Sequence, residues 1–149
     1  MKVAKGFTLI ELLVTVAVII IMATIAVPGF QRMMASSQLA SDYNEMLSGL
    51  HLARSEAVKR RQDVSLKPKI NSYEVVFNGG ALRSRDSLKS TVALSNGEGA
   101  GEEVSFNKLG RIVKSSYCED GCTLTISYSG AGSKAIYISG FGRVGRGGS

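Results

Sequence analysis

The sequence predicts an α+β protein in which one long N-terminal helix packs against antiparallel β-sheet. Three observations support this prediction. An apolar run near the N-terminus is long enough for a membrane-spanning helix, apolar residues recur at helical spacing after Pro28, and the chain beyond Arg61 consists of short β-branched segments separated by Gly or Asn. With 149 residues in total, the chain has room for one anchored domain and little more.

The first expected element is a transmembrane helix over residues 7–28. The apolar run from Leu12 to Val27, taken together with Phe7 to Ile10, reaches the ~20 residues that a helix needs to cross a bilayer. Lys2 and Lys5 precede this run and no acidic residue accompanies them. The positive-inside rule therefore places the N-terminus in the cytoplasm and the rest of the chain on the other side of the membrane.

Glu11 is the one carboxylate in this segment, and it needs an explanation. A carboxylate in the bilayer costs about 2 to 3 kcal/mol, so we expect it to have a partner. No cation follows it within the apolar run, but cutting the chain after Gly6 would create a new amine on Phe7. A removable secretory signal fits poorly because the apolar core is too long, whereas a plain signal anchor stays open but gives no reason for the acid.

The residues around Glu11 carry a resemblance to a known family. A basic leader, Gly6, the run Phe7-Thr8-Leu9-Ile10-Glu11-Leu12-Leu13, an apolar stretch and Pro28 closely resemble the class III signal of type IV pilins and type II secretion pseudopilins. The resemblance implies that residues 1–6 are a leader, that a prepilin peptidase removes it after Gly6, and that Phe7 is then N-methylated. It also implies that Glu11 pairs with the N-terminal amine of a neighbouring subunit during assembly. An acid that merely reaches the membrane interface is the alternative.

Residues 29–60 are expected to form a second, amphipathic half of the helix. Pro28 removes one backbone donor, so we expect a bend there with helix on both sides. The apolar face predicted to pack against the rest of the protein recurs at steps of three and four: Leu39, Tyr43, Met46, Leu47, Leu50, Ala53 and Ala57.

Residues 61–149 are expected to form a periplasmic β-rich head of type IV pilin-like architecture. The Gly-rich end from about Gly145 is expected to be a flexible tail. Turn signals separate most of the predicted strands, as in Asn78-Gly79-Gly80, Asn96-Gly97 and Ser129-Gly130. The predicted strands are Gln62 to Leu66, Tyr73 to Phe77, Ser90 to Leu94, Val104 to Phe106, Arg111 to Val113, Thr123 to Tyr128 and Ala135 to Ile138.

Three further segments resemble the GspH/FimT group of minor pilins and pseudopilins: Leu50 to Arg60, Val104 to Arg111 and Ile136 to Val144. This resemblance implies a minor pilin that is incorporated into a type IV pilus and supports its assembly or initiation. A minor pseudopilin of a type II secretion system is the alternative, and sequence alone decides poorly between the two machines. The implied partners are other pilins and minor pilins, the prepilin peptidase and the inner membrane. The implied location is the bacterial inner membrane, with a single pass, and the pilus fibre after assembly.

No residue set in the sequence indicates catalysis, a cofactor or a metal site, and we expect a non-enzyme. His51 is the only histidine and lies among predicted helix residues. Cys118 and Cys122 flank a turn signal, and a disulfide is the leading interpretation because the head faces an oxidising compartment. Closing so small a loop contributes about 2 kcal/mol in the chain-entropy model. A redox or metal-binding pair is the alternative.

The C-terminal end carries basic residues without accompanying acids. Lys134, Arg143 and Arg146 follow the last carboxylate, and the overall charge is +6 at pH 7. Arginine among glycines suits phosphate contact, so these three residues are predicted to bind double-stranded DNA, with the basic patches Arg54 to Arg61 and Lys67 to Lys69 assisting. A solvated basic terminus is the alternative.

A resemblance also bears on this prediction. Some FimT-type minor pilins bind DNA in natural transformation through a C-terminal G-R-x-R motif, whereas residues 142–146 of this chain read G-R-V-G-R. If this end is a strand, the displacement by one residue moves the second arginine to the other face.

Overall fold

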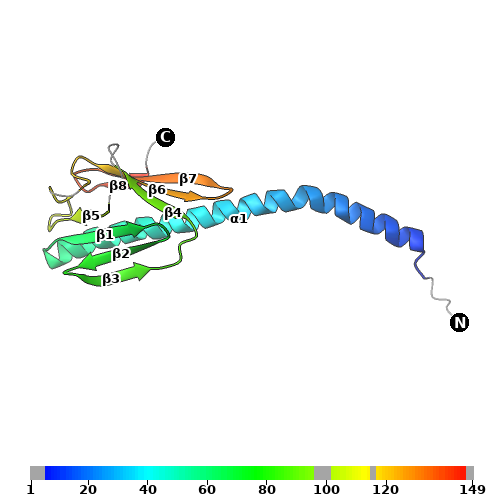
Figure 1. Ribbon diagram of the computed structural model, residues 1–149, viewed down its shortest axis with the longest axis horizontal. Helices are drawn as coiled ribbons and strands as arrows, with labels where there is room; N and C mark the ends of the chain where they lie inside the picture. The colour runs from blue at the N-terminus through cyan, green and yellow to red at the C-terminus, as the bar shows by residue number, and fades with distance from the viewer. Residues whose placement is uncertain (1–5, 96–101, 115–116, 147–149) are drawn as a thin grey trace. The chain divides into compact units, whose positions relative to one another are not determined.

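The computed structural model describes residues 6–95, 102–114 and 117–146. The leader lysines Lys2 and Lys5, the predicted turn at Asn96-Gly97 and the end of the chain from residue 147 lie outside the described residues. The chain divides into two compact units, Met1–Met34 and Ala35–Ser149. The described residues form one helix and eight strands (Figure 1): α1 (Leu9–Arg60), β1 (Val64–Lys69), β2 (Ser72–Phe77), β3 (Gly80–Arg85), β4 (Thr91–Ser95), β5 (Val104–Phe106), β6 (Cys122–Tyr128), β7 (Gly132–Ile138) and β8 (Val144–Arg146).

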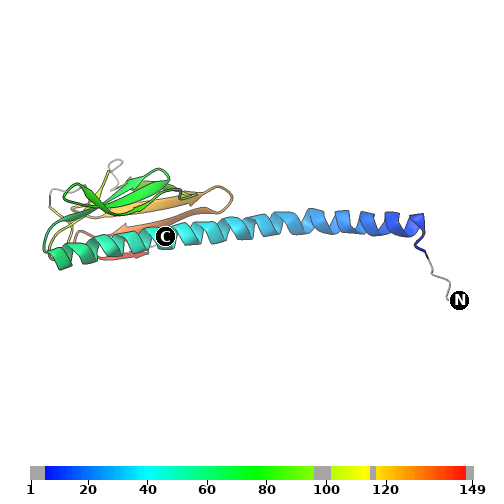
Figure 2. The same ribbon diagram turned by 90° about the horizontal axis from the view of Figure 1, so that it is seen from below.

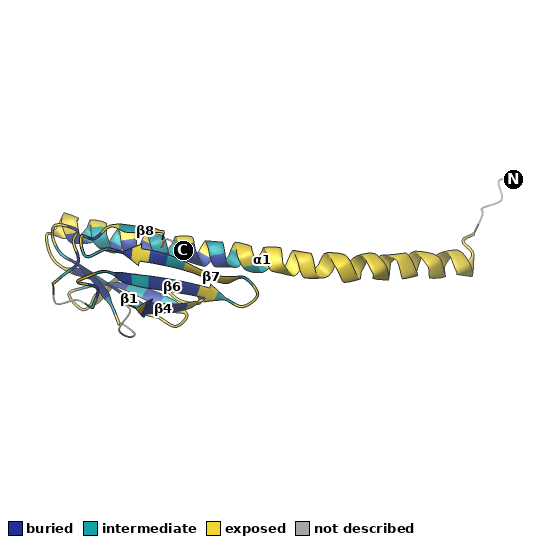
Figure 3. Ribbon diagram, turned by 90° about the horizontal axis from the view of Figure 1, so that it is seen from above, coloured by how far each residue is buried: buried dark blue, intermediate teal, exposed yellow. Residues whose placement is uncertain are grey.

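The first unit contains the N-terminal part of α1. Residues 6–34 are all exposed in the isolated chain, including the large apolar side chains, as the uniform yellow of this segment in Figure 3 shows. The helix continues through Pro28, and the bend expected at this residue stays a prediction. Among the described residues, α1 is the one helix that is long and apolar enough to cross a membrane.

The second unit combines the C-terminal part of α1 with two antiparallel sheets. One sheet has the strand order β3-β2-β1-β5 and the other has the order β4-β6-β7-β8. Figure 2 shows both sheets on the same side of this part of α1. The predicted class, a long helix packed against antiparallel sheet, is therefore confirmed, whereas the division of the strands into two sheets was not foreseen.

The core lies between the helix and the inward faces of the two sheets. The predicted apolar face of the helix is confirmed, because six of its seven residues are buried and Leu47 is partly buried. Gly49 lies in the middle of this face, where a Cβ would come within 2.6 Å of Cε2 of Tyr73. The absence of a side chain at Gly49 thus lets the helix approach the ring of Tyr73, which is fully buried.

Three expectations about strands need correction. The segment Arg111 to Val113 forms no strand but only an isolated bridge between Phe106 and Ile112. Gly110, with φ of 71°, turns the chain here, and the returning segment pairs with β5 only through the bonds Asn107 N–H to the Arg111 carbonyl and Val113 N–H to the Ser105 carbonyl. The backbone N–H of Ile112 points away from β5 and donates to the carbonyl of Gly140. Strands β3 and β8 were not predicted as separate strands. The tail expected to be flexible from about Gly145 is, up to Arg146, part of β8 and paired with β7.

Candidate functional site

The helix begins next to the predicted cleavage position. Phe7 is 85% exposed, and the helix starts two residues later at Leu9. The backbone N–H of Glu11 donates to Oγ1 of Thr8 at 3.3 Å. Thr8 therefore caps the helix, and Glu11 occupies the third helical position, as in a capping box. The sequence Thr8-Leu9-Ile10-Glu11 carries this signal, which the sequence analysis missed. Glu11 also lies in the first turn, where the helix dipole favours a negative charge.

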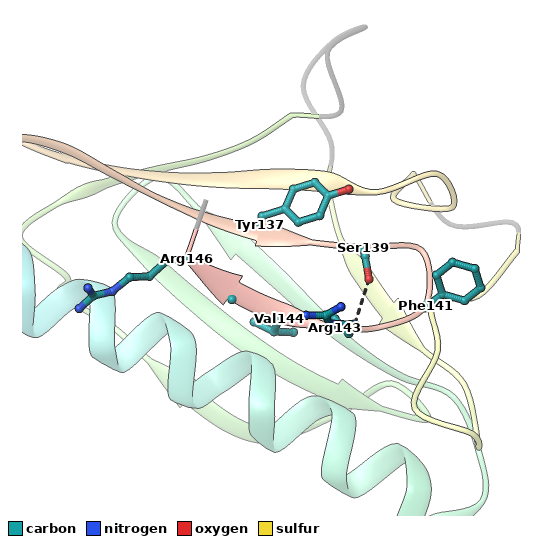
Figure 4. Close-up of a pocket in the computed structure, with 7 residues that line it drawn as sticks. Tyr137, Ser139, Phe141, Arg143, Val144 and Arg146 are labelled. Atoms are coloured by element: carbon teal, nitrogen blue, oxygen red, sulfur yellow. Dashed lines mark hydrogen bonds between the residues drawn. The ribbon is translucent and has the colours of Figure 1, made fainter. Parts of the chain in front are cut away.

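The three basic residues predicted to bind DNA do not all lie on one face of the strand pair β7–β8, although Arg143 and Arg146 line one depression. Lys134 and Ile136 are two residues apart on β7, so their side chains lie on the same face of the sheet. Ile136 is fully buried, and Lys134 therefore lies on the α1-facing side. Its Nζ lies 5.8 Å from the ring centroid of Tyr43 on α1. Arg146 is the register partner of Ile136 and therefore shares that side. In Figure 4, Arg146 and Tyr137 leave the strand pair on opposite sides.

Arg143 lies on the other side of the same strand pair. The N–H of Ser139 donates to the carbonyl of Arg143 at 2.9 Å, which continues the ladder between β7 and β8 beyond its last register pair. By alternation along β8, Arg143 shares the outward side with Gly145, the partner of Tyr137. The two arginines thus lie on opposite faces of the edge strand β8. The spacing G-R-x-G-R predicts that, in a strand, the second arginine lies on the face opposite the first, and the register of β8 agrees.

Two shallow depressions meet at the aromatic side chains of Tyr137 and Phe141. The first, of ≈ 330 Å³, also includes Arg143 and Arg146, and no acidic residue lines it (Figure 4). The second, of ≈ 560 Å³, has mixed charge, because Arg111, Lys114, Glu119 and Asp120 all line it. Tyr137 is 47% exposed and Phe141 is 73% exposed. An aromatic ridge therefore separates a cationic surface from one without net charge.

The disulfide predicted for Cys118 and Cys122 is present, and it supports this ridge. Both cysteines are buried, and their Cα atoms lie 5.0 Å apart. Between them, Gly121 has φ of 108°, and a Cβ there would come within 3.0 Å of the hydroxyl of Tyr137. The backbone of Glu119 lies against Gly140 in the turn between β7 and β8, where a Cβ would overlap the carbonyl oxygen of Glu119.

The basic patches expected to assist DNA binding make contacts within the protein. Nε of Arg54 donates to the carbonyl of Gly110 at 3.1 Å, so this residue joins the helix to the turn that follows β5. Arg60 pairs with Glu56 at 2.6 Å. In the second patch, Lys67 pairs with Glu103 at 3.5 Å and Lys69 pairs with Glu74 at 3.0 Å. By contrast, within the described residues no carboxylate is within salt-bridge distance of Lys134, Arg143 or Arg146.

A partly buried polar cluster at the helix–sheet boundary was not foreseen from sequence. Glu45 accepts a hydrogen bond from the hydroxyl of Tyr73 at 2.8 Å and pairs with Arg83 at 2.6 Å. Burial raises the pKa of Glu45, but these two partners outweigh it and hold the pKa below 4.5. Burial and the hydrogen bond to Glu45 raise the pKa of Tyr73 to about 12. The cluster fixes β2 and β3 on the helix.

His51 and possible metal-ligating groups are the remaining candidates for chemistry. His51 is an exposed residue of α1 that shares a wide, shallow surface with Arg54 and Lys59. Among residues 6–95, 102–114 and 117–146, no group of three or more His, Cys, Asp or Glu side chains is placed to hold a metal ion.

A long N-terminal helix with an exposed apolar first part and a disulfide-containing α+β head defines a type IV pilin-like subunit. Two family profiles match the sequence: "Type II transport protein GspH" over residues 42–142 and "Prokaryotic N-terminal methylation motif" over residues 1–27. The chain belongs to the GspH family of type IV minor pilins and pseudopilins.

Relatives and solved structures agree with this assignment. A fimbrial protein of Pseudomonas aeruginosa is 34% identical over 106 residues, which is 70% of this chain and 68% of that protein. Fimbrial protein Q of Moraxella bovis is 34% identical over 101 residues, or 65% of this chain and 62% of that protein. The crystal structure of the type IV minor pilin FimU of Pseudomonas aeruginosa has a TM-score of 0.62 at 24% identity, over 75% of this chain and 90% of that chain. This likeness supports the fold.

Proposed function

We propose that the chain is a minor pilin that is cleaved after Gly6, N-methylated at Phe7 and incorporated into a type IV pilus, where it supports assembly or initiation. Membership of the family and the match to the N-terminal methylation motif support the processing step. Gly6 and Phe7 precede the helix and are exposed, so a membrane peptidase can reach the bond between them in an extended chain. The anchor crosses the inner membrane once, with the head in the periplasm.

The observation that carries the proposal is the lone carboxylate of Glu11 on an apolar and fully exposed helix segment. Its charge is costly in lipid unless a cation neutralises it. Cleavage after Gly6 supplies an amine on Phe7, and in a filament this amine on a staggered neighbouring helix can reach the carboxylate. Pairing would then favour subunits that have docked. The other pilins of the filament are the proposed partners, and the prepilin peptidase is the proposed processing enzyme.

The place of Glu11 in the first turn of a capped helix gives its charge a competing local role, namely stabilisation of the helix start, and variants can separate this role from intersubunit pairing. Glu11→Leu removes the charge, whereas Thr8→Ala removes the cap and keeps the charge. We expect Glu11→Leu to insert normally into the membrane but to enter filaments poorly, and Thr8→Ala to enter filaments nearly as wild type does. Recovery of each variant in sheared pili and in the membrane fraction measures this. Normal filament entry by Glu11→Leu, or an equal defect in both variants, would contradict the intersubunit role.

The alternative machine is a type II secretion system, in which the chain would be a minor pseudopilin. The description of the matching family as a type II transport protein favours it, whereas the relatives described as fimbrial proteins favour a pilus. Deletion of the gene from its native host distinguishes them: we expect loss of surface pili with normal protein secretion. Loss of secretion with normal pili would establish the alternative.

We propose DNA binding at the end of the head as a second function, with a role in DNA uptake during natural transformation. The specific observation is that Arg143 and Arg146 line one depression without any acidic residue. Guanidinium groups bind phosphate oxygens, and such contacts weaken as salt concentration rises. We expect the full chain in neutral detergent to bind DNA in a salt-dependent manner, and Arg143→Ala and Arg146→Ala to weaken binding. A DNA affinity that changes neither with salt concentration nor with either substitution would contradict this proposal.

A further inference from the structure

Three turns of the head lie side by side around Phe141. This residue stands between Gly140 and Gly142 in the turn that joins β7 to β8, and both glycines are in close contact with the backbone of another segment. A Cβ at Gly140 would overlap the carbonyl oxygen of Glu119 in the loop that the disulfide closes. A Cβ at Gly142 would come within 3.0 Å of the Cα of Arg111, in the turn that follows β5. Phe141 therefore has the disulfide loop on one side and the turn after β5 on the other.

The two sides of this surface carry opposite charges. Glu119 and Asp120 lie in the disulfide loop. Arg111 and Lys114 belong to the segment that follows β5. All four residues are exposed, and together with Phe141 they line the second depression. Within the part of the chain that the structure describes, no salt bridge pairs any of the four, so both charges are available to a partner.

The centre of this surface is apolar. Phe141 is 73% exposed and points away from the sheet (Figure 4). Leu109 is 67% exposed, Tyr137 is 47% exposed, and both line the same depression. Exposed aromatic side chains surrounded by polar groups are typical of the centre of a protein interface, where the contact excludes water. A depression without net charge offers little to a small ion, so a protein partner fits this surface better.

The charge pattern specifies this partner. It must present bases opposite the disulfide loop, acids opposite the segment after β5, and an apolar group opposite Phe141. A second copy of this chain carries this pattern. Rotation about a two-fold axis that passes beside Phe141 and runs between the two charged sides places the acids of each copy opposite the bases of the other. Each charge pair then occurs twice, which strengthens a small contact.

We propose that this surface joins two copies of the chain in a symmetric dimer. Phe141 lies at its centre, and the acids of each disulfide loop pair with Arg111 and Lys114 of the other copy. The inference goes beyond the function proposed above, because it concerns contact between identical heads. It requires neither processing of the N-terminus nor pairing between anchor helices.

Two variants of uniform charge test the pairing. Arg111→Glu with Lys114→Glu makes both sides acidic, whereas Glu119→Lys with Asp120→Lys makes both sides basic. Analytical ultracentrifugation of the full chain in neutral detergent measures the mass of the protein in each complex. We expect the wild type to be mostly dimeric at about 100 µM and each variant alone to dimerise at least about tenfold more weakly. An equimolar mixture of the two variants should recover the dimer, because an acidic copy then meets a basic one.

Three further variants separate this contact from other causes of association. Phe141→Ala keeps every charge and removes the apolar centre, and it should weaken the dimer at least about tenfold. Lys89→Glu reverses an exposed cation between β3 and β4 and should dimerise as the wild type does. Glu11→Leu changes only the anchor helix and should also leave the dimer intact. Circular dichroism verifies that each variant keeps the fold.

Three outcomes would overturn the inference. The first is a wild type that stays monomeric at this concentration. The second is a dimer that persists equally in both charge variants, because the anchor helices would then hold it together. The third is a mixture of the charge variants that remains monomeric, because the surface would then not be complementary to itself. None of these outcomes contradicts processing and filament entry, which the variants of Glu11 and Thr8 test separately.

Discussion

The Cα of Gly142 lies against the carbonyl oxygen of Gly110, and a Cβ at position 142 would overlap that oxygen. The turn between β7 and β8 is thus packed, backbone to backbone, on the turn that follows β5. The carbonyl of Gly140 accepts a hydrogen bond from the N–H of Ile112 at 3.2 Å in the same contact. Two segments far apart in the sequence are joined here through backbone atoms, and this contact holds the aromatic ridge in place.

Gly142→Ala should therefore be strongly destabilising. The residue has φ of 79°, which disfavours any side chain, and the new methyl group would also force the two turns apart. We expect a loss of at least about 2 kcal/mol in the free energy of unfolding, measured by denaturant titration. Gly145→Ala is the matched control, since a Cβ there meets open space, and it should change stability little. Equal stability of the two variants would contradict the packing described.

Asp42 should be a main contributor to the attachment of β4 to the helix. It is buried and accepts hydrogen bonds from both the N–H and the hydroxyl of Ser90, at 2.9 and 2.7 Å. Asp42→Ala leaves the buried N–H of Ser90 without this partner, so we expect a loss of about 3 kcal/mol. Ser90→Ala removes only the hydroxyl and should cost less. Thermal unfolding of both variants measures which substitution lowers stability more. A larger loss of stability in Ser90→Ala than in Asp42→Ala would contradict this role of Asp42.

The pKa of Tyr73 predicts a loss of stability in alkali. Because the folded state raises this pKa from 10.0 to about 12, the unfolded state releases the proton first as pH rises. The contribution of Tyr73 is therefore fully present below pH 10 and is lost between pH 10 and about 12. We expect Tyr73→Phe to show a shallower decline than wild type in this range, with Tyr137→Phe as the control. Parallel declines in unfolding experiments would count against the raised pKa.

The disulfide should stabilise the head modestly. Replacing Cys118 and Cys122 by serine should lower the free energy of unfolding by about 2 kcal/mol, since the closed loop is short. Reducing agent should lower the melting temperature of the wild type and leave the double variant unchanged. If reducing agent left the melting temperature of the wild type unchanged, the disulfide would not contribute to stability.

The helix and its buried face were predictable because their signals are local. Apolar residues from Leu39 to Ala57 recur at a period set by helix geometry, and the core forms where this period places it. The hairpin turns at Asn78-Gly79 and Ser129-Gly130 were likewise visible in the sequence, and Asn78 and Gly79 both have the positive φ that such turns require.

The missed features depend on partners that are distant in the sequence. β3 and β8 are edge strands, rich in Gly and Arg, and only pairing with β2 and β7 makes them strands. The burial of Asp42 follows from Ser90, which is 48 positions away. At the site proposed to bind DNA, the arginines were visible in the sequence, but their division between two faces required the register of β8.

The most direct test of the central claim is the mass of the N-terminal peptide of the chain recovered from filaments of its native cell. We expect a peptide that begins with N-methylated Phe7 and lacks residues 1–6. A functional filament subunit that still begins with Met1 would contradict it, because Glu11 would then have no neighbouring Phe7 amine to pair with.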